Sequence, residues 1–98
     1  MFCTQEVIEN WLKKNCPELS WRRVGGDKPP IRTDSFYLNR SEGYEIRDLM
    51  YEFFKSCNNI QCNKENLEEV YNEIQNYKKG EKVKREEVLN HLYDVFNC

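Results

Sequence analysis

Residues 41–57, SEGYEIRDLMYEFFKSC, carry the clearest amphipathic pattern in the chain. Their apolar side chains recur every three or four positions, which is the spacing of one face of an α-helix. These side chains are Ile46, Leu49, Met50, Phe53, Phe54 and Cys57. Ser41 can cap the start of this helix, and Asn58–Asn59 interrupts it. The stretch therefore predicts a helix that buries one face in a hydrophobic core.

Three other segments show the same helical period. Thr4 can cap a first helix, which Pro17 ends. Another helix starts near Asn63 and stops before Gly80, where a glycine suits a left-handed C-cap. The last helix covers roughly residues 84–97. Packing between helices should therefore supply most of the core.

Residues 20–40 show a different pattern. The run from Gly25 to Pro30, GGDKPP, is strong turn punctuation, and β-prone residues follow from Ile31 to Leu38. This pattern predicts two short strands joined by a loop. The expected fold class is α+β: a mostly helical single domain over residues 1–98, in the order helix, strand, strand, helix, helix, helix. The small β-hairpin should pack on a helical bundle.

Composition and charge narrow the class of protein. The chain has 98 residues, a formal net charge of −2 and a pI near 5.5, so a strongly basic nucleic-acid binder is not the default. No apolar run approaches the ~18 residues of a membrane span. The first residues lack the basic and apolar segments of a signal peptide. We expect a cytoplasmic protein, located in the host cell if a phage encodes it.

The cysteines suggest a metal site. The chain has five of them, an odd number, which without a secretory signal indicates reduced thiols or metal ligands. Cys57 and Cys62 flank the break after the 41–57 helix, and His91 and Cys98 lie on the last helix. Three thiolates and one imidazole would make a tetrahedral structural zinc site.

Helix direction ranks these ligands. In an up-and-down bundle the last helix runs antiparallel to the helix before it, which returns Cys98 to the end that holds residues 57–62. His91 lies about 10.5 Å earlier along the helix axis, so it is the weakest ligand, and Cys16 could replace it. Two alternatives stay open: the cysteines are core residues and ordinary thiols, or Cys3 and Cys16 serve a redox role.

No catalytic group is recognisable, so we expect that the protein is not an enzyme. His91 is the only histidine, and a Cys–His nucleophile pair would also need an orienting group and an oxyanion hole. The loop that begins at Gly25 resembles a phosphate-binding loop only loosely, because it lacks the Gly-Lys-Ser/Thr ending.

The charges are distributed unevenly along the chain. Residues 20–40 have a net charge of +3, with aromatic side chains interleaved, and residues 41–77 have a net charge of −5. A basic hairpin could bind nucleic acid or an acidic protein face, and an acidic helical face would attract a basic groove. The predicted contact residues are Arg22, Arg23, Lys28 and Arg32 on the hairpin, and Glu65, Glu68 and Glu69 on the helical face. Ordinary solvation is the alternative for both patches.

A helix-turn-helix over about residues 64–97 is a second way to bind nucleic acid. Lys82, Lys84 and Arg85 would open its recognition helix. Glu86 and Glu87 follow at once, however, and would face the phosphates.

The chain has no alanine and is rich in Asn, Lys, Glu and Tyr. In size, acidity and composition it resembles small phage-encoded inhibitors, including anti-CRISPR proteins, a class with no shared fold. The expected function is non-enzymatic binding of a macromolecule: inhibition by occluding a site on a larger, nucleic-acid-handling protein. The alternative is a nucleic-acid-binding regulator that uses the helix-turn-helix or the basic hairpin. A small enzyme comes third.

Overall fold

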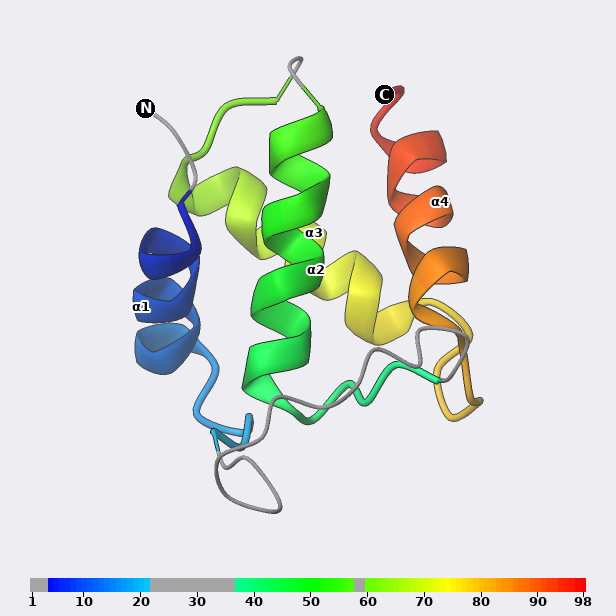
Figure 1. Cartoon of the computed structure of the whole chain (residues 1–98), viewed down its shortest axis with the longest axis horizontal. Coiled ribbons are helices and arrows are strands. Elements are labelled where there is room, and N and C mark those ends of the chain that lie inside the picture. The colour runs from blue at the N-terminus through cyan, green and yellow to red at the C-terminus, as the bar shows by residue number, and fades with distance from the viewer. Residues whose placement is uncertain (1–3, 22–36, 58–59) are drawn as a thin grey trace.

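The computed structural model describes residues 4–21, 37–57 and 60–98 (Figure 1). These residues form four α-helices close to the predicted positions. The helices are α1 (Gln5–Asn15), α2 (Gly43–Ser56), α3 (Lys64–Asn76) and α4 (Arg85–Val95). None of the helices in this part of the chain is long and apolar enough to cross a membrane.

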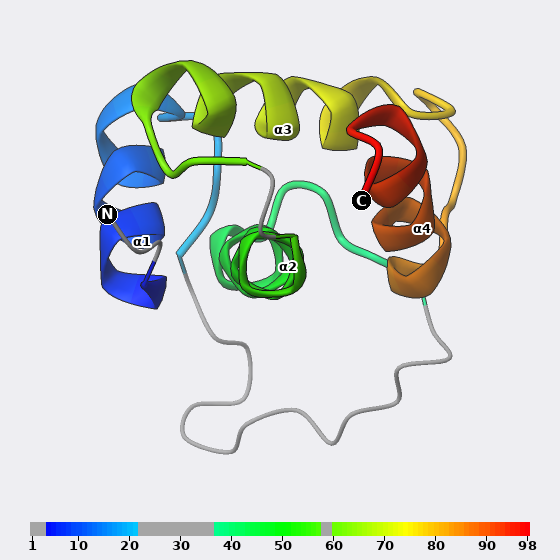
Figure 2. The ribbon, with the colours of Figure 1, turned by 90° about the horizontal axis from the view of Figure 1, so that it is seen from above.

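Helix α2 is the centre of the fold. Viewed end-on, it is flanked by α1, α3 and α4 (Figure 2). Its apolar stripe is wide enough to serve all three neighbours, and Ile46, Leu49, Met50 and Phe53 are fully buried. Helix α1 runs antiparallel to α2, α4 rises in the same direction as α2, and α3 crosses behind (Figure 1).

The core is entirely apolar in the residues that the structure describes. The other helices contribute residues at helical spacing, and the connecting segments add Leu19, Leu38 and Val83. No polar or charged side chain of the described residues is buried. Polar chemistry in this part of the molecule therefore lies at its surface.

The predicted cap of α2 is wrong by one residue. The N-cap is Glu42, whose side chain accepts a hydrogen bond from the backbone N–H of Tyr44 at 3.2 Å. Ser41 donates its hydroxyl hydrogen to Oδ1 of Asn39 instead, at 2.8 Å. The predicted cap of α1 is correct, since Thr4 accepts a hydrogen bond from the backbone N–H of Val7. Helix α3 starts next to Asn63, as predicted, and the structure adds that Asn63 caps it by accepting from the backbone N–H of Asn66.

The α+β prediction is wrong. The described residues contain helices and no β-strand, and the middle of the predicted hairpin, residues 22–36, lies outside them. The two ends of that segment pair with different partners. Ser20 forms an isolated parallel bridge with Glu42, and Tyr37 forms an antiparallel bridge with Lys84. Because these partners belong to the flanks of α2 and α4, the ends are held by the helical bundle and not by each other.

A glycine at the start of α2 lets the segment after α1 approach closely. A Cβ atom at Gly43 would lie 2.4 Å from Cε2 of Trp21, which is too close for any side chain. The backbone bond from the N–H of Gly43 to the carbonyl of Ser20, at 2.6 Å, fixes the same approach. Trp21 therefore packs directly on the first turn of α2.

Candidate functional site

The outer surface of α3 carries a group of exposed carboxylates. Glu65, Glu68 and Glu69 are all exposed, as their helical spacing predicts. Within the described residues, none of the three takes part in a side-chain hydrogen bond or ion pair. Residues three and four apart are neighbours on a helix surface, so these like charges repel each other by about 0.2–0.5 kcal/mol per pair. The three carboxylates are therefore exposed without an ion-pair partner in this part of the molecule.

A fourth carboxylate joins them from outside α3. Glu18, in the segment after α1, accepts a hydrogen bond from the hydroxyl of Tyr71 on α3. Burial, followed by the negative charges of Glu18 and Glu68, raises the pKa of the Cys16 thiol to about 11, while its hydrogen bond with Tyr71 acts in the opposite direction. Glu18 and Glu68 therefore lie near the same thiol. We call Glu18, Glu65, Glu68 and Glu69 the acidic face.

The carboxylates that face other helices are paired, in contrast to the acidic face. Glu9 on α1 binds Lys13 and Arg47, and these hydrogen bonds lower its pKa. Glu52 on α2 pairs with Arg85 on α4 at 2.6 Å. The pairs Glu9–Arg47 and Glu52–Arg85 join α2 to α1 and to α4, whereas Glu9–Lys13 lies within α1.

The predicted metal ligands are only partly brought together. Cys57 and Cys98 form a disulfide, with their Cα atoms 5.5 Å apart. Cys98 therefore lies near Cys57, as predicted. Helix α4 reaches this end by running in the same direction as α2. It is not antiparallel to α3, which crosses behind α2 (Figure 1). Cys62 is also disulfide-bonded. The expectation of reduced thiols is thus not met for these three cysteines.

His91 contacts other partners. Its Nε2 atom lies 3.0 Å from Oε1 of Glu73, and its ring centroid lies 4.3 Å from that of Tyr77. Within residues 4–21, 37–57 and 60–98, no group of three or more His, Cys, Asp or Glu side chains is arranged to hold a metal ion. Zinc binding stays a prediction.

Zinc and the disulfide compete for the same sulfur atoms, because zinc binds thiolates. We therefore expect zinc uptake only after reduction. Elemental analysis of protein purified without chelator, before and after treatment with a reductant, measures this directly. A zinc content near one equivalent in the reduced protein, lost in Cys62→Ser, would support the site. A content below about a tenth of an equivalent, with the thiols titratable, would exclude it.

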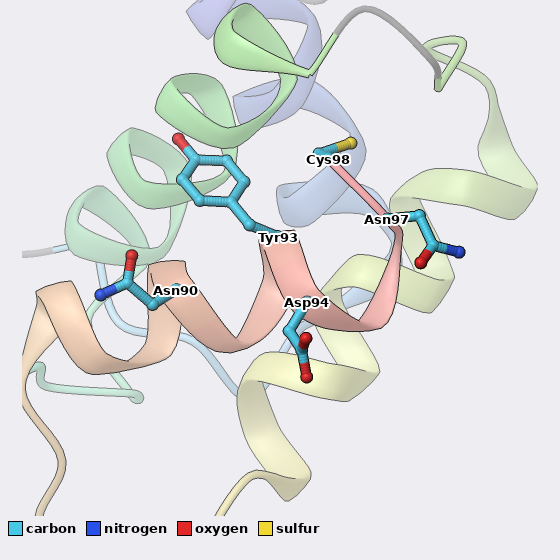
Figure 3. Close-up of a pocket in the computed structure, with 5 residues that line it drawn as sticks. All are labelled: Asn90, Tyr93, Asp94, Asn97 and Cys98. Atoms are coloured by element: carbon cyan, nitrogen blue, oxygen red, sulfur yellow. The ribbon is translucent and has the colours of Figure 1, made fainter.

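A shallow hollow lies beside the C-terminal half of α4. It is lined by Asn90, Tyr93, Asp94, Asn97 and Cys98 (Figure 3). Figure 3 shows Tyr93 directed towards α2 and Asp94 directed away from it. Since the sulfur of Cys98 is in a disulfide, it is not a nucleophile in this state. We assign no chemistry to this hollow.

The predicted basic hairpin residues Arg22, Arg23, Lys28 and Arg32 lie outside the described residues. Arg40, which contributes to the same positive charge in the sequence, has a structural role. Its guanidinium donates hydrogen bonds of 3.0–3.2 Å to four backbone carbonyls: those of Ile74 and Gln75 in the last turn of α3, and those of Lys78 and Glu81 in the turn that follows. Arg40 thus caps α3 and is not a free surface charge.

The predicted recognition helix is α4. Arg85 at its start is paired with Glu52. Its exposed residues at spacings of four are Glu86, Asn90 and Asp94. Two carboxylates on this outward face would repel a phosphate backbone.

Comparisons with protein-family models, with curated proteins and with solved structures find no match to this chain.

Proposed function

We propose that the protein is a non-enzymatic inhibitor that binds a larger, nucleic-acid-handling protein through its acidic face. It would act in the cytoplasm of the host cell, as an anti-CRISPR-like protein would. The observation that carries the proposal is the set of exposed carboxylates on α3, which have no cationic partner in the described part of the chain. A basic groove that normally holds a nucleic-acid backbone would supply such partners.

The way α3 is held supports this proposal. Its inner face is fully buried at Val70 and Ile74, and its last turn is capped by Arg40. A helix fixed on one face presents its outer charges without losing much conformational entropy on binding. The acidic face can therefore act as a preorganised surface.

The second candidate function is a regulator that binds nucleic acid directly, with α3 and α4 as its helix-turn-helix. The outward face of α4 opposes it, because Glu86 and Asp94 are exposed there and Arg85 is committed to Glu52. The side chains that contact the phosphates beside a groove are cations and neutral donors, and Glu86 and Asp94 are neither. We therefore rank inhibition of a protein above direct regulation.

Charge reversal on the acidic face tests the proposal. Replacing Glu65, Glu68 and Glu69 by Lys should weaken inhibition and binding of the target more than tenfold, or by more than about 1.4 kcal/mol. The assay is DNA cleavage by a panel of purified CRISPR nucleases, with binding measured by calorimetry on any nuclease that is inhibited. The matched control replaces Glu6, Glu81 and Glu86, three exposed carboxylates outside the acidic face, and makes the same change in net charge.

Three outcomes would count against the proposal. The control could weaken binding as much as the acidic-face variant, which would make net charge the cause. Arg22→Glu with Arg23→Glu could abolish binding while the acidic-face variant does not, which would place the contact on the basic segment. The protein could also inhibit no nuclease yet shift duplex DNA with a steep salt dependence, which would favour the regulator.

A further inference from the structure

The turn between α3 and α4 gathers positive charge. Lys79, Lys82 and Lys84 are exposed, and no ion pair joins their ammonium groups to a carboxylate in the described residues. The backbone N–H of Lys84 donates a hydrogen bond of 3.5 Å to Glu87. The turn is tight, since Lys78 and Gly80 both have positive φ values, of 45° and 87°. Glu81 lies in the same turn, so residues 79–84 keep a net charge of +2. Their neighbour Lys78 differs, because it is paired with Glu87.

An exposed aromatic ring sits beside these lysines. Tyr37 is 56% exposed and is the more exposed of the two large hydrophobic residues that stand out on the described surface. Its backbone pairs with Lys84, and the next residue donates its N–H to the carbonyl of Val83 at 2.8 Å. The ammonium group of Lys82 lies 5.6 Å from the ring centroid. Backbone bonds therefore hold residues 37–38 against the turn, and the ammonium group of Lys82 lies near the Tyr37 ring.

We propose that this patch, made of Tyr37, Lys79, Lys82 and Lys84, binds single-stranded nucleic acid. Lysines can contact the phosphates, and an exposed aromatic ring offers a base a surface to stack on. The patch lies at the α4 end of α3, and the acidic face lies towards the α1 end (Figures 1 and 2). The two surfaces are distinct, so this inference does not rest on the proposed function.

The tyrosine favours a single strand over other polyanions. In a duplex the faces of the bases are stacked on one another and cannot reach an exposed ring. An acidic peptide would gain from the lysines alone. Stacking of one base on an aromatic side chain changes the affinity by about fivefold or more, which is enough to separate these partners by experiment.

Fluorescence anisotropy with a labelled oligothymidylate of about 15 nucleotides tests the proposal. Tyr37→Leu should weaken binding at least fivefold, the lower bound of about 1 kcal/mol for stacking, whereas Tyr37→Phe keeps the ring and should bind like the wild type. Lys82→Gln and Lys84→Gln should each weaken binding, and Lys14→Gln, at an exposed lysine on α1, should not. Since the Tyr37 bridge uses backbone atoms, none of these changes should alter the fold.

The salt dependence gives an independent check. Three phosphate contacts to a single strand predict a slope of about −2 in log K against log salt, or a loss of about 20-fold between about 50 and 200 mM. Three results would overturn the proposal. They are no anisotropy change at low salt, equal binding of a duplex or of polyglutamate, and a Tyr37→Leu variant that binds like the wild type.

Discussion

Phe53→Ala should lower the free energy of unfolding by about 4 kcal/mol, within the 3–5 kcal/mol typical of a buried aromatic residue. Phe53 is 0% exposed in the middle of α2. Its ring contacts those of Phe54, Tyr93 and Phe96, with centroids 5.4, 5.7 and 5.5 Å away. Truncation would leave a cavity between the central helix and α4. Since a small domain has only about 5–15 kcal/mol of stability in total, this single change removes a large part of it.

Urea denaturation followed by circular dichroism measures the effect. If Phe53→Ala does not fold, the milder substitution Phe53→Leu can be measured instead. It should lower the free energy of unfolding by about 1–2 kcal/mol. Val95→Ala is the matched control on α4, because Val95 is 40% exposed and its truncation should cost no more than about 0.5 kcal/mol. A loss below about 1 kcal/mol for Phe53→Ala would contradict the central position of α2.

The helices could be predicted because their signals are local. The spacing of Ile46, Leu49 and Phe53 indicates a helix whatever surrounds it. The same pattern predicts one buried face, and the position of α2 between three helices is visible only in the structure (Figure 2). The error in residues 20–40 has the opposite cause. The turn-forming residues Gly and Pro are also a local signal, but strand pairing depends on residues far away in the sequence. Ser20 pairs with Glu42 before α2, and Tyr37 pairs with Lys84 before α4. The turn residues carry no information about these partners.

The same distinction holds for the candidate sites. Exposure of Glu65, Glu68 and Glu69 follows from the period of their own helix. Glu18 was missed because it reaches α3 through Tyr71, 53 residues along the chain. The predicted return of Cys98 to Cys57 is correct, but its premise of an up-and-down bundle is not, because α3 crosses behind α2 (Figure 1).

Arg40 shows why a count of charges along the sequence does not tell which charges are free at the surface. In the sequence it adds one positive charge to residues 20–40. In the fold it supplies the end of α3 with hydrogen-bond donors, because the last carbonyls of a helix have no intrahelical partner. The bond from Nε2 of Gln75 to the carbonyl of Arg40, at 2.8 Å, returns the contact.

Arg40→Met should therefore lower the free energy of unfolding by about 3 kcal/mol. The methionine keeps much of the apolar stem but removes every donor, and hydrogen bonds from a charged group are worth about 1.5–3 kcal/mol each when buried. Two of the four bonds, those to Lys78 and Glu81, are solvent-exposed. Water can replace these two, so the total stays well below the sum. Favourable interaction of the cation with the helix dipole adds up to about 1 kcal/mol.

Arg40→Lys separates the charge from the geometry. A lysine keeps the positive charge at the helix end, but its ammonium group cannot reach four carbonyls in the planar arrangement of a guanidinium. It should recover less than half of the lost stability. Amide hydrogen exchange should localise the change, with faster exchange in the last turn of α3 and little change in α1. Lys79→Met, at an exposed residue near the same turn, is the control and should stay within about 0.5 kcal/mol of the wild type. If Arg40→Lys were as stable as the wild type, the positive charge alone would hold the end of α3. The hydrogen bonds of Arg40 would then contribute little to fixing the helix that carries most of the acidic face.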